Sequence, residues 1–199
     1  MRGPDDEWDD VASIVLQCRD RWQALNQQGI RHCTDFVNNM FLLEEIYFSP
    51  DRSSRELDES KLQMSSLQIE GRIQDVLSKM RIVFIRLRSG IEVVQQRRHV
   101  LYNEGGCQLL RMHGLGSWTI DDLVHELYEL LNMFARELVS KASFVNCISR
   151  GRGCPSTRFS HEQWHVQLSV WLFEPFLCPI RLGRITNALT NRLKSRGHR

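Results

Sequence analysis

Two cysteines and two histidines in the C-terminal half of the chain are of the right types to bind zinc. Cys147, Cys154, His161 and His165 follow one another with six, six and three residues between them. Structural zinc sites normally place each pair of ligands only a few residues apart, and the cysteine pair here is spread more widely. The spacing therefore favours a helix-end cysteine, a loop cysteine and two surface histidines. We predict no metal site and no cofactor.

Two glycine pairs, in residues 114–116 and 151–153, have the G-x-G pattern. A dinucleotide-binding loop needs three glycines between a strand and a helix, and no strand is predicted before either pair. No Ser/His/Asp or Cys/His arrangement is recognisable, and we expect His113 and His125 at the surface or at helix ends. The sequence therefore predicts a protein that is not an enzyme.

The C-terminal segment 180–199 is a basic tail. Residues 175–199 carry six Lys or Arg side chains and no acidic one. Such a tail can contact phosphates or an acidic partner, which makes a nucleic-acid-binding helical module the alternative function. No aromatic residue that could stack on a base follows Phe176, and a solvated chain end is the commoner explanation. We therefore predict no direct binding of nucleic acid.

Residues 169–177, SVWLFEPFL, form the most unusual stretch of the sequence. Seven of these nine residues are apolar, which is more than one face of a helix needs. Tryptophan and phenylalanine contribute a large share of the binding energy when they are buried at an interface. They also pack well in a core at the end of a helix. Contact with a partner and packing in the core both remain open for this segment.

The length and composition of the chain are those of a globular protein. It has 199 residues, of which 42% are hydrophobic and 25% charged, with a net charge of +2. This length is ample for a buried core. The longest apolar runs have four residues, so no membrane span is expected, and the acidic first ten residues do not resemble a secretory signal. The six scattered cysteines, without a C-x-x-C pair, are expected to be reduced thiols of an intracellular protein.

Apolar residues recur at spacings of three and four along most of the chain, which is the pattern of amphipathic helices. The stripes predict helices at 8–28, 32–48, 59–98, 119–149 and 161–174, followed by the basic tail. Gly29 is the expected stop of the first helix, and 49–58, 99–117 and 149–158 are expected loops. Lys141 falls on an apolar stripe, where we expect either the end of packing or a carboxylate of a partner.

These elements predict an all-α fold, because no strict alternation and no hairpin signal is present. A helix over 59–98 would be about 60 Å long, whereas a compact chain of this size has a diameter of about 40 Å. Either this helix breaks at Gly71 or Gly90, or the molecule is elongated. We favour an elongated antiparallel helical bundle with coiled-coil character, in which residues 1–199 form a single domain.

Three short motifs follow one another along the chain. The first, W-x-x-L-N-x-x-G, runs from Trp22 through Leu25 to Gly29. The second, LLNMFAREL, begins at Leu130 in the helix that follows Trp118 and leads to Lys141. The third, S-x-W-L-x-x-P-F, covers residues 169–176. In this order and at these separations, the motifs resemble the cyclin-dependent kinase 2-interacting protein family.

The resemblance covers roughly residues 8–30 and 117–178, while the middle helix is similar only in length and heptad character. The family tends to carry a second tryptophan one heptad before the first motif, where this chain has Val15 and, further back, Trp8. The loop 149–158 and the basic tail have no counterpart that we can match to the family.

The resemblance implies a small, non-enzymatic, coiled-coil adaptor that is located in the nucleus. An additional location in the cytoplasm stays open. Its implied partners are another small helical subunit, AAA+ ATPases, and replication and checkpoint kinases. The implied roles are DNA replication, checkpoint signalling and maturation of the pre-60S ribosomal particle, within a hetero-oligomer. The motifs and the aromatic segment together suggest the partner-binding residues Trp22, Leu25, Lys141, Ser169, Trp171, Leu172, Pro175 and Phe176.

Overall fold

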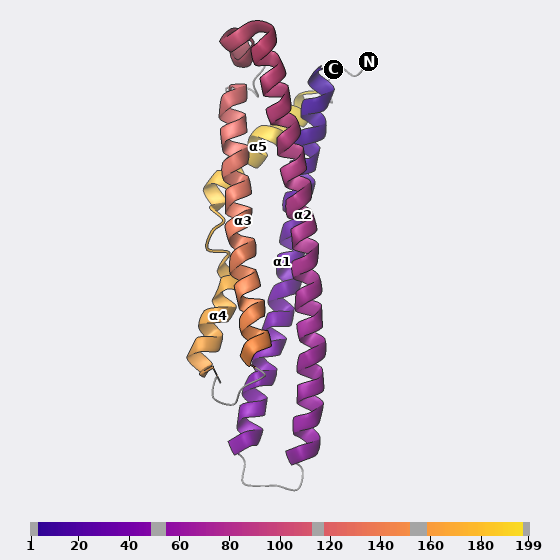
Figure 1. Ribbon diagram of the computed structural model, residues 1–199, viewed down its shortest axis with the longest axis vertical. Helices are drawn as coiled ribbons and strands as arrows, with labels where there is room; N and C mark the ends of the chain where they lie inside the picture. The colour runs from indigo at the N-terminus through magenta and orange to yellow at the C-terminus, as the bar shows by residue number, and fades with distance from the viewer. Residues whose placement is uncertain (1–3, 49–54, 113–117, 152–158, 197–199) are drawn as a thin grey trace. The chain divides into compact units, whose positions relative to one another are not determined.

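The structure is a computed structural model that describes residues 4–48, 55–112, 118–151 and 159–196. These residues form five helices and no strand, so the predicted all-α helical bundle is confirmed. The helices, labelled in Figure 1, are α1 (Pro4–Phe48), α2 (Arg55–Met112), α3 (Ile120–Gly151), α4 (His161–Phe173) and α5 (Pro179–Arg196).

The described helices group into two compact units, and the prediction that residues 1–199 form a single domain stays a prediction. Unit 1 comprises Met1–Trp22, Arg81–Arg136 and Phe176–Arg199, and unit 2 comprises Gln23–Met80 and Glu137–Pro175. The three long helices α1, α2 and α3 each contribute one segment to each unit. Helix α5 belongs to unit 1 and helix α4 to unit 2, so each unit is a bundle of four helical segments.

In unit 1 the predicted apolar stripe of α1 is the buried face of that helix. Trp8, Val15 and Trp22 are each at most 6% exposed. They pack with buried residues of the other three segments, and Trp22 meets Phe134 edge-on with 4.4 Å between the ring centres. The main apolar contributions of the other segments are Val83, Leu87, Ile91 and Val94 from α2, Ile120, Leu123, Leu127 and Leu130 from α3, and Ile185 and Leu189 from α5.

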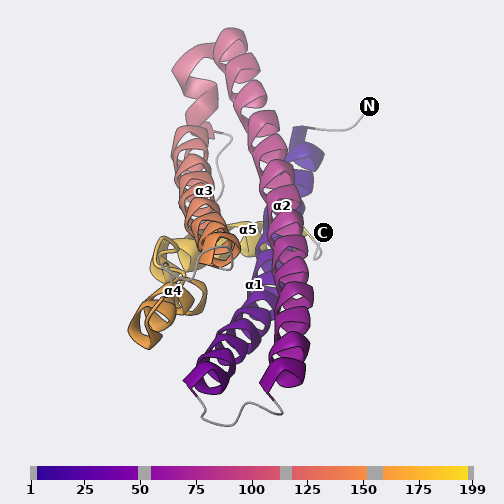
Figure 2. The same ribbon diagram turned by 60° about the horizontal axis from the view of Figure 1, so that its bottom comes forward.

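In unit 2, α1 and α2 run side by side, as both views show (Figures 1 and 2). In the same views α4 lies on the side of α3 away from α2. It also packs on α1, where the rings of Phe36 and Trp164 are 5.7 Å apart. The apolar core of this unit is formed by Leu25, Cys33, Phe36, Val37, Ile69, Ile73, Val76, Leu77, Met80, Phe144, Val145, Ile148, Trp164, Leu168 and Trp171.

Several predicted helix boundaries are wrong. The predicted helices 8–28 and 32–48 are one helix, α1, which continues through Gly29. Helix α2 begins at Arg55 and extends to Met112, into the predicted loop 99–117, and it passes Gly71 and Gly90 without the break that was the less favoured alternative. A glycine inside a helix costs only about 1 kcal/mol relative to alanine, and burial of the flanking apolar residues offsets that cost. The segments 49–54, 113–117 and 152–158, which fall in the predicted loops, lie outside the described residues.

Helix α4 closely matches the predicted helix 161–174, whereas most of the predicted basic tail 180–199 is a helix, α5. Helix α4 begins after Ser160, whose hydroxyl accepts a hydrogen bond from the Gln163 backbone while the Gln163 side chain accepts one from the Ser160 backbone. This reciprocal capping box satisfies donors at the start of the helix. The basic tail forms the helix α5, which begins at Pro179, a residue well suited to a first helical position because it has no N–H to satisfy.

The start of α3 is capped by Thr119 and Asp122. The Thr119 backbone N–H and hydroxyl donate to the Asp122 carboxylate at 2.9 and 2.7 Å, and the Asp122 N–H donates to the Thr119 hydroxyl at 3.1 Å. Thr119 therefore caps the start of α3. These hydrogen bonds, first of all the one from the Thr119 hydroxyl, lower the pKa of Asp122.

A lowered pKa in the folded state makes this cap dependent on pH. Its contribution to the free energy of unfolding is present above the pKa of the unfolded chain and is lost as the pH falls through the lower, folded value. We expect Asp122→Asn to lose less stability than the parent protein when the pH falls below about 4, as measured by urea unfolding. Thr119→Val should remove the same pH-dependent component. An unchanged acid dependence in both variants would contradict this assignment.

Candidate protein-interaction site

The first and third motifs of the sequence meet inside unit 2. Trp171 of α4 is fully buried against α1 at Gly29. A Cβ atom added at Gly29 would lie only 1.9 Å from Cζ3 of the Trp171 ring, so no larger residue fits there without displacing the ring. Asn26, one turn before Gly29, donates from its side-chain amide to the Trp171 carbonyl at 3.4 Å. Two residues of the first motif, Asn26 and Gly29, therefore position Trp171, and with it α4, on α1.

The lysine that ends the second motif lies on the same tryptophan. The Lys141 Nζ atom is 4.7 Å from the centre of the Trp171 ring, within cation–π range. It is 3.0 Å from a Glu137 carboxylate oxygen and 3.9 Å from one of Glu174. The side chains of Lys141 and Glu137 are both 0% exposed. Packing therefore does not end at Lys141, and the carboxylates that it meets belong to its own unit.

Cys33 of α1 is a further buried residue near Lys141. It is fully buried on α1, and burial raises the pKa of its thiol, while the charge of Lys141 acts in the opposite direction. The buried environment dominates, because a thiolate would lose its hydration there. Cys33 is thus an apolar core residue and not a nucleophile. The described cysteines Cys18, Cys33, Cys147 and Cys178 are all free thiols.

The structure separates the predicted partner-binding residues into two groups. Trp22, Leu25, Lys141 and Trp171 are at most 2% exposed and are core residues of their units. Leu172, Pro175 and Phe176 are exposed, and Ser169 is half-buried with its hydroxyl donating to the Val166 carbonyl at 2.6 Å. Leu172, one residue after the buried Trp171, is 45% exposed and does not share its buried side of the helix.

Helix α4 has a second apolar face that the sequence analysis missed. Trp164, Leu168 and Trp171 point into unit 2, whereas Val166 and Phe173 are 64% and 77% exposed. Val166, Val170 and Phe173 are spaced by four and three residues, so they lie along one side of the helix, and Val170 is half-buried. We call these three residues the outer face of α4. A second apolar set at helical spacing was the signal present in the sequence.

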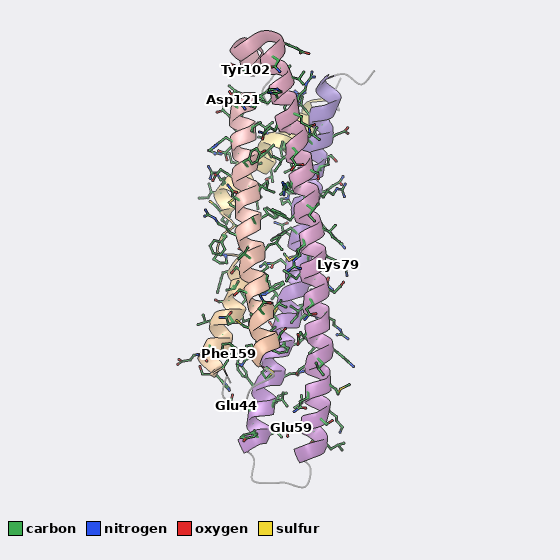
Figure 3. The ribbon with its side chains drawn as sticks, viewed as in Figure 1. Glu44, Glu59, Lys79, Tyr102, Asp121 and Phe159 are labelled. Atoms are coloured by element: carbon green, nitrogen blue, oxygen red, sulfur yellow. The ribbon has the colours of Figure 1, made fainter. Side chains whose placement is uncertain are left out.

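The candidate zinc ligands take part in other contacts. His161 stacks on Phe41 with 3.9 Å between ring centres, and its Nε2 atom lies 3.0 Å from the Glu44 carboxylate. His165 also contacts Phe41, at 5.4 Å. Figure 3 labels Glu44 near the end of α1 and Phe159 just before α4. Cys154 lies outside the described residues, within which no group of three or more side chains is placed to hold a metal ion.

Three basic side chains of α5 form ion pairs with acidic residues of unit 1. Arg181 binds Glu126 at 3.0 Å and Glu129 at 2.8 Å, and Arg184 also binds Glu126. Arg192 approaches Asp9 of α1 at 3.5 Å. Three of the six basic residues that defined the tail therefore serve to attach α5 to its own unit. This use of their charge weakens the case for a nucleic-acid-binding tail.

Unit 2 also contains a polar cleft of about 410 Å³ between α1 and α2. Two of its lining residues are joined by a hydrogen bond from the Asn39 amide to the Ser65 hydroxyl at 3.1 Å. The lining residues are Asp35, Asn38, Asn39, Ser65, Gln68, Ile69 and Arg72. Amides and hydroxyls of this kind bind water well.

Among the helices that the structure describes, none has both the length and the apolar content needed to cross a membrane. No protein-family model matches the chain, and no curated protein is significantly similar to it in sequence.

Proposed function

We propose that this protein is a non-enzymatic helical adaptor subunit that pairs with another helical protein. The observation that carries the proposal is the outer face of α4. A helix that carries apolar residues on two opposite sides normally buries both of them. Here the inner face is filled by Trp164, Leu168 and Trp171, while Val166 and Phe173 remain exposed. An exposed aromatic and aliphatic stripe on a rigidly attached helix is a suitable anchor for a partner helix.

The rigid attachment of α4 supports this role. Gly29, Asn26 and Lys141 hold Trp171 from the inner side, which fixes the orientation of the outer face. A preorganised helix loses little conformational entropy when a partner binds, so more of the contact energy contributes to affinity. We therefore interpret the buried residues of the three motifs as the support of the interaction surface, and the exposed ones as part of it.

The resemblance of the three motifs supports a more specific form of the proposal. In this form the protein is a nuclear subunit of an AAA+ ATPase complex, alongside a second small helical protein. The implied processes are DNA replication, checkpoint signalling and pre-60S ribosome maturation. The kinases that act in replication and checkpoint control are further proposed partners.

The test is to disrupt the outer face and to measure partner recovery. We expect Val166→Asp combined with Phe173→Asp to lower the recovery of partners from cells at least about tenfold, because buried apolar anchors dominate binding energy. The measurement is affinity purification of the tagged full chain at moderate salt, followed by mass spectrometry. The more specific form predicts that AAA+ ATPases and a second small helical protein are recovered by the parent chain.

The control variant is Val139→Asp, which changes a residue of α3 in the same unit that is 71% exposed. It should retain all partners. Each variant should keep its free energy of unfolding within about 0.5 kcal/mol of the parent, since exposed substitutions rarely cost more. Full recovery of partners by the α4 double variant would refute the proposed role of the outer face.

A further inference from the structure

Helix α2 has an exposed apolar stripe in unit 1 that is separate from its buried face. Ile82, Ile85, Val93 and Val100 are 64%, 60%, 44% and 40% exposed. The exposed polar residues Ser89 and Gln96 continue the same line, so the spacing is three or four residues throughout. The buried residues Val83, Leu87 and Val94 follow a different side of the helix. Apolar surface of this extent, in heptad-like register, is uncommon on the free face of a monomer.

The charges beside this stripe are strongly one-sided. Residues 81–103 contain five arginines and one acidic residue, Glu92, and one of the arginines, Arg98, lies away from the stripe and pairs with Asp121 of α3. At 3.6 residues per turn, Arg81 and Arg88 lie along one edge of the stripe and Arg86 along the other, and all three are exposed. Arg86 donates to the neutral amide oxygen of Gln17 at 2.9 Å. Glu92 pairs with Arg88 at 2.9 Å, an exposed ion pair of the kind that contributes little and exchanges readily.

We propose that this face of α2 binds an amphipathic helix of a partner protein whose apolar stripe is flanked on both sides by acidic residues. The inference rests on the proposed adaptor function and specifies the partner. The apolar residues of α2 would occupy the centre of the contact. Arginines at its edges would favour carboxylates and disfavour positively charged side chains on the partner, as flanking charges do in paired helices.

The apolar stripe favours a protein helix over a nucleic acid. A nucleic acid would satisfy the arginines with phosphates, but its backbone offers no apolar surface against Ile82, Ile85 and Val93. These side chains would then stay in contact with water. A helix with its own leucine or isoleucine stripe would bury these side chains. Acidic residues beside that stripe would pair with the arginines.

The test uses the full chain and a pair of synthetic probes. Each probe is a fluorescent four-heptad peptide with leucine and isoleucine in the core positions, and the flanking positions carry glutamate in one peptide and lysine in the other. We expect the acidic peptide to bind at least about 30-fold more tightly, equivalent to about 2 kcal/mol, when measured by fluorescence anisotropy. Its affinity should fall as salt is added, because the flanking charges are exposed.

Variants then identify the surface. Ile82→Asp combined with Val93→Asp should abolish binding of the acidic peptide, and Arg81→Glu combined with Arg88→Glu should reverse the preference in favour of the lysine peptide. The α4 variant Val166→Asp/Phe173→Asp is the matched control and should bind the acidic peptide like the parent. Circular dichroism of each variant checks that the helices are intact.

Three results would overturn the inference: equal affinity for the two peptides, binding of neither, or binding of duplex DNA that is lost when Arg81 and Arg88 are replaced.

The outcomes for the two proposals are separable. If neither peptide binds while the α4 variant still loses its cellular partners, the inference about α2 is wrong and the adaptor function stands. If the acidic peptide binds as expected while the α4 variant keeps all partners, the role proposed for α4 is wrong and the α2 surface stands.

Discussion

Replacing Gly29 with alanine is expected to lower the free energy of unfolding by about 2–4 kcal/mol, although the same change in most helices is stabilising. The reason is the 1.9 Å between the added Cβ and the Trp171 ring. The ring must leave its place or α4 must move away from α1, and either response forfeits packing of a fully buried tryptophan, whose complete loss costs about 3–5 kcal/mol. Urea unfolding followed by circular dichroism measures the change.

Gly71 provides the matched control. It also lies inside a helix of unit 2, but nothing is within 4 Å of a Cβ added there. Gly71→Ala should therefore raise the free energy of unfolding by up to about 1 kcal/mol, which is the helix-propensity difference. A smaller residue at position 171 should also relieve the clash, so Gly29→Ala should cost less in a Trp171→Leu background. If Gly29→Ala stabilises the protein as Gly71→Ala does, the close approach of Trp171 is refuted.

The second large effect concerns Lys141. Lys141→Met should lower the free energy of unfolding by about 3–5 kcal/mol, because it removes the ammonium group while the Glu137 carboxylate stays buried. Combining it with Glu137→Leu should recover most of the loss, since a buried ion pair can often be exchanged for apolar residues of similar size. Thermal and urea unfolding of the single and double variants measure both effects.

Lys79 is the control for this experiment. It forms an ion pair with Asp75 at the same i, i+4 spacing, but both side chains are about half exposed and Lys79 points away from the bundle (Figure 3). Lys79→Met should change the free energy of unfolding by no more than about 0.5 kcal/mol. Similar losses for Lys79→Met and Lys141→Met would show that burial of the Lys141 pair is not what stabilises unit 2.

The contact between Lys141 and Glu174 also accounts for the unusual backbone conformation of Glu174. Glu174 ends α4 with φ at 41° and ψ at 62°, in the left-handed region where glycine is usual. A residue with a Cβ pays roughly 1–2 kcal/mol there. The Glu174 carboxylate lies 3.9 Å from the Lys141 ammonium, a contact that glycine could not provide. We interpret this attraction as the compensation for the backbone strain.

The sequence predicted the buried faces better than the ends of the helices. The stripe from Trp8 to Leu25 on α1 is buried as predicted, because apolar spacing directly reports which side of a helix must leave water. The expected stop at Gly29 is wrong, because the local propensity of one glycine is smaller than the packing energy on either side of it. Local rules could not show that this glycine is there to accommodate a tryptophan.

The candidate site was only partly predictable for a related reason. The unusual apolar content of 169–177 was visible in the sequence, but a stripe does not state which helix it packs against. Trp171 was therefore equally compatible with a partner or with the core, and only its contacts with Gly29 and Lys141 place it inside unit 2. The outer face with Val166 and Phe173 could have been found by counting both sides of the helix.

The contact between Asn26 and Trp171 has a consequence for biosynthesis. It joins residues 145 positions apart in the chain. At roughly 5–20 residues per second, a ribosome needs about 7 to 29 seconds to make the intervening segment. During that time the side of α1 around Gly29 has been translated but α4 has not. The nascent chain therefore carries an open apolar surface through most of its own synthesis, available to any chaperone or ready-made helix that meets it first.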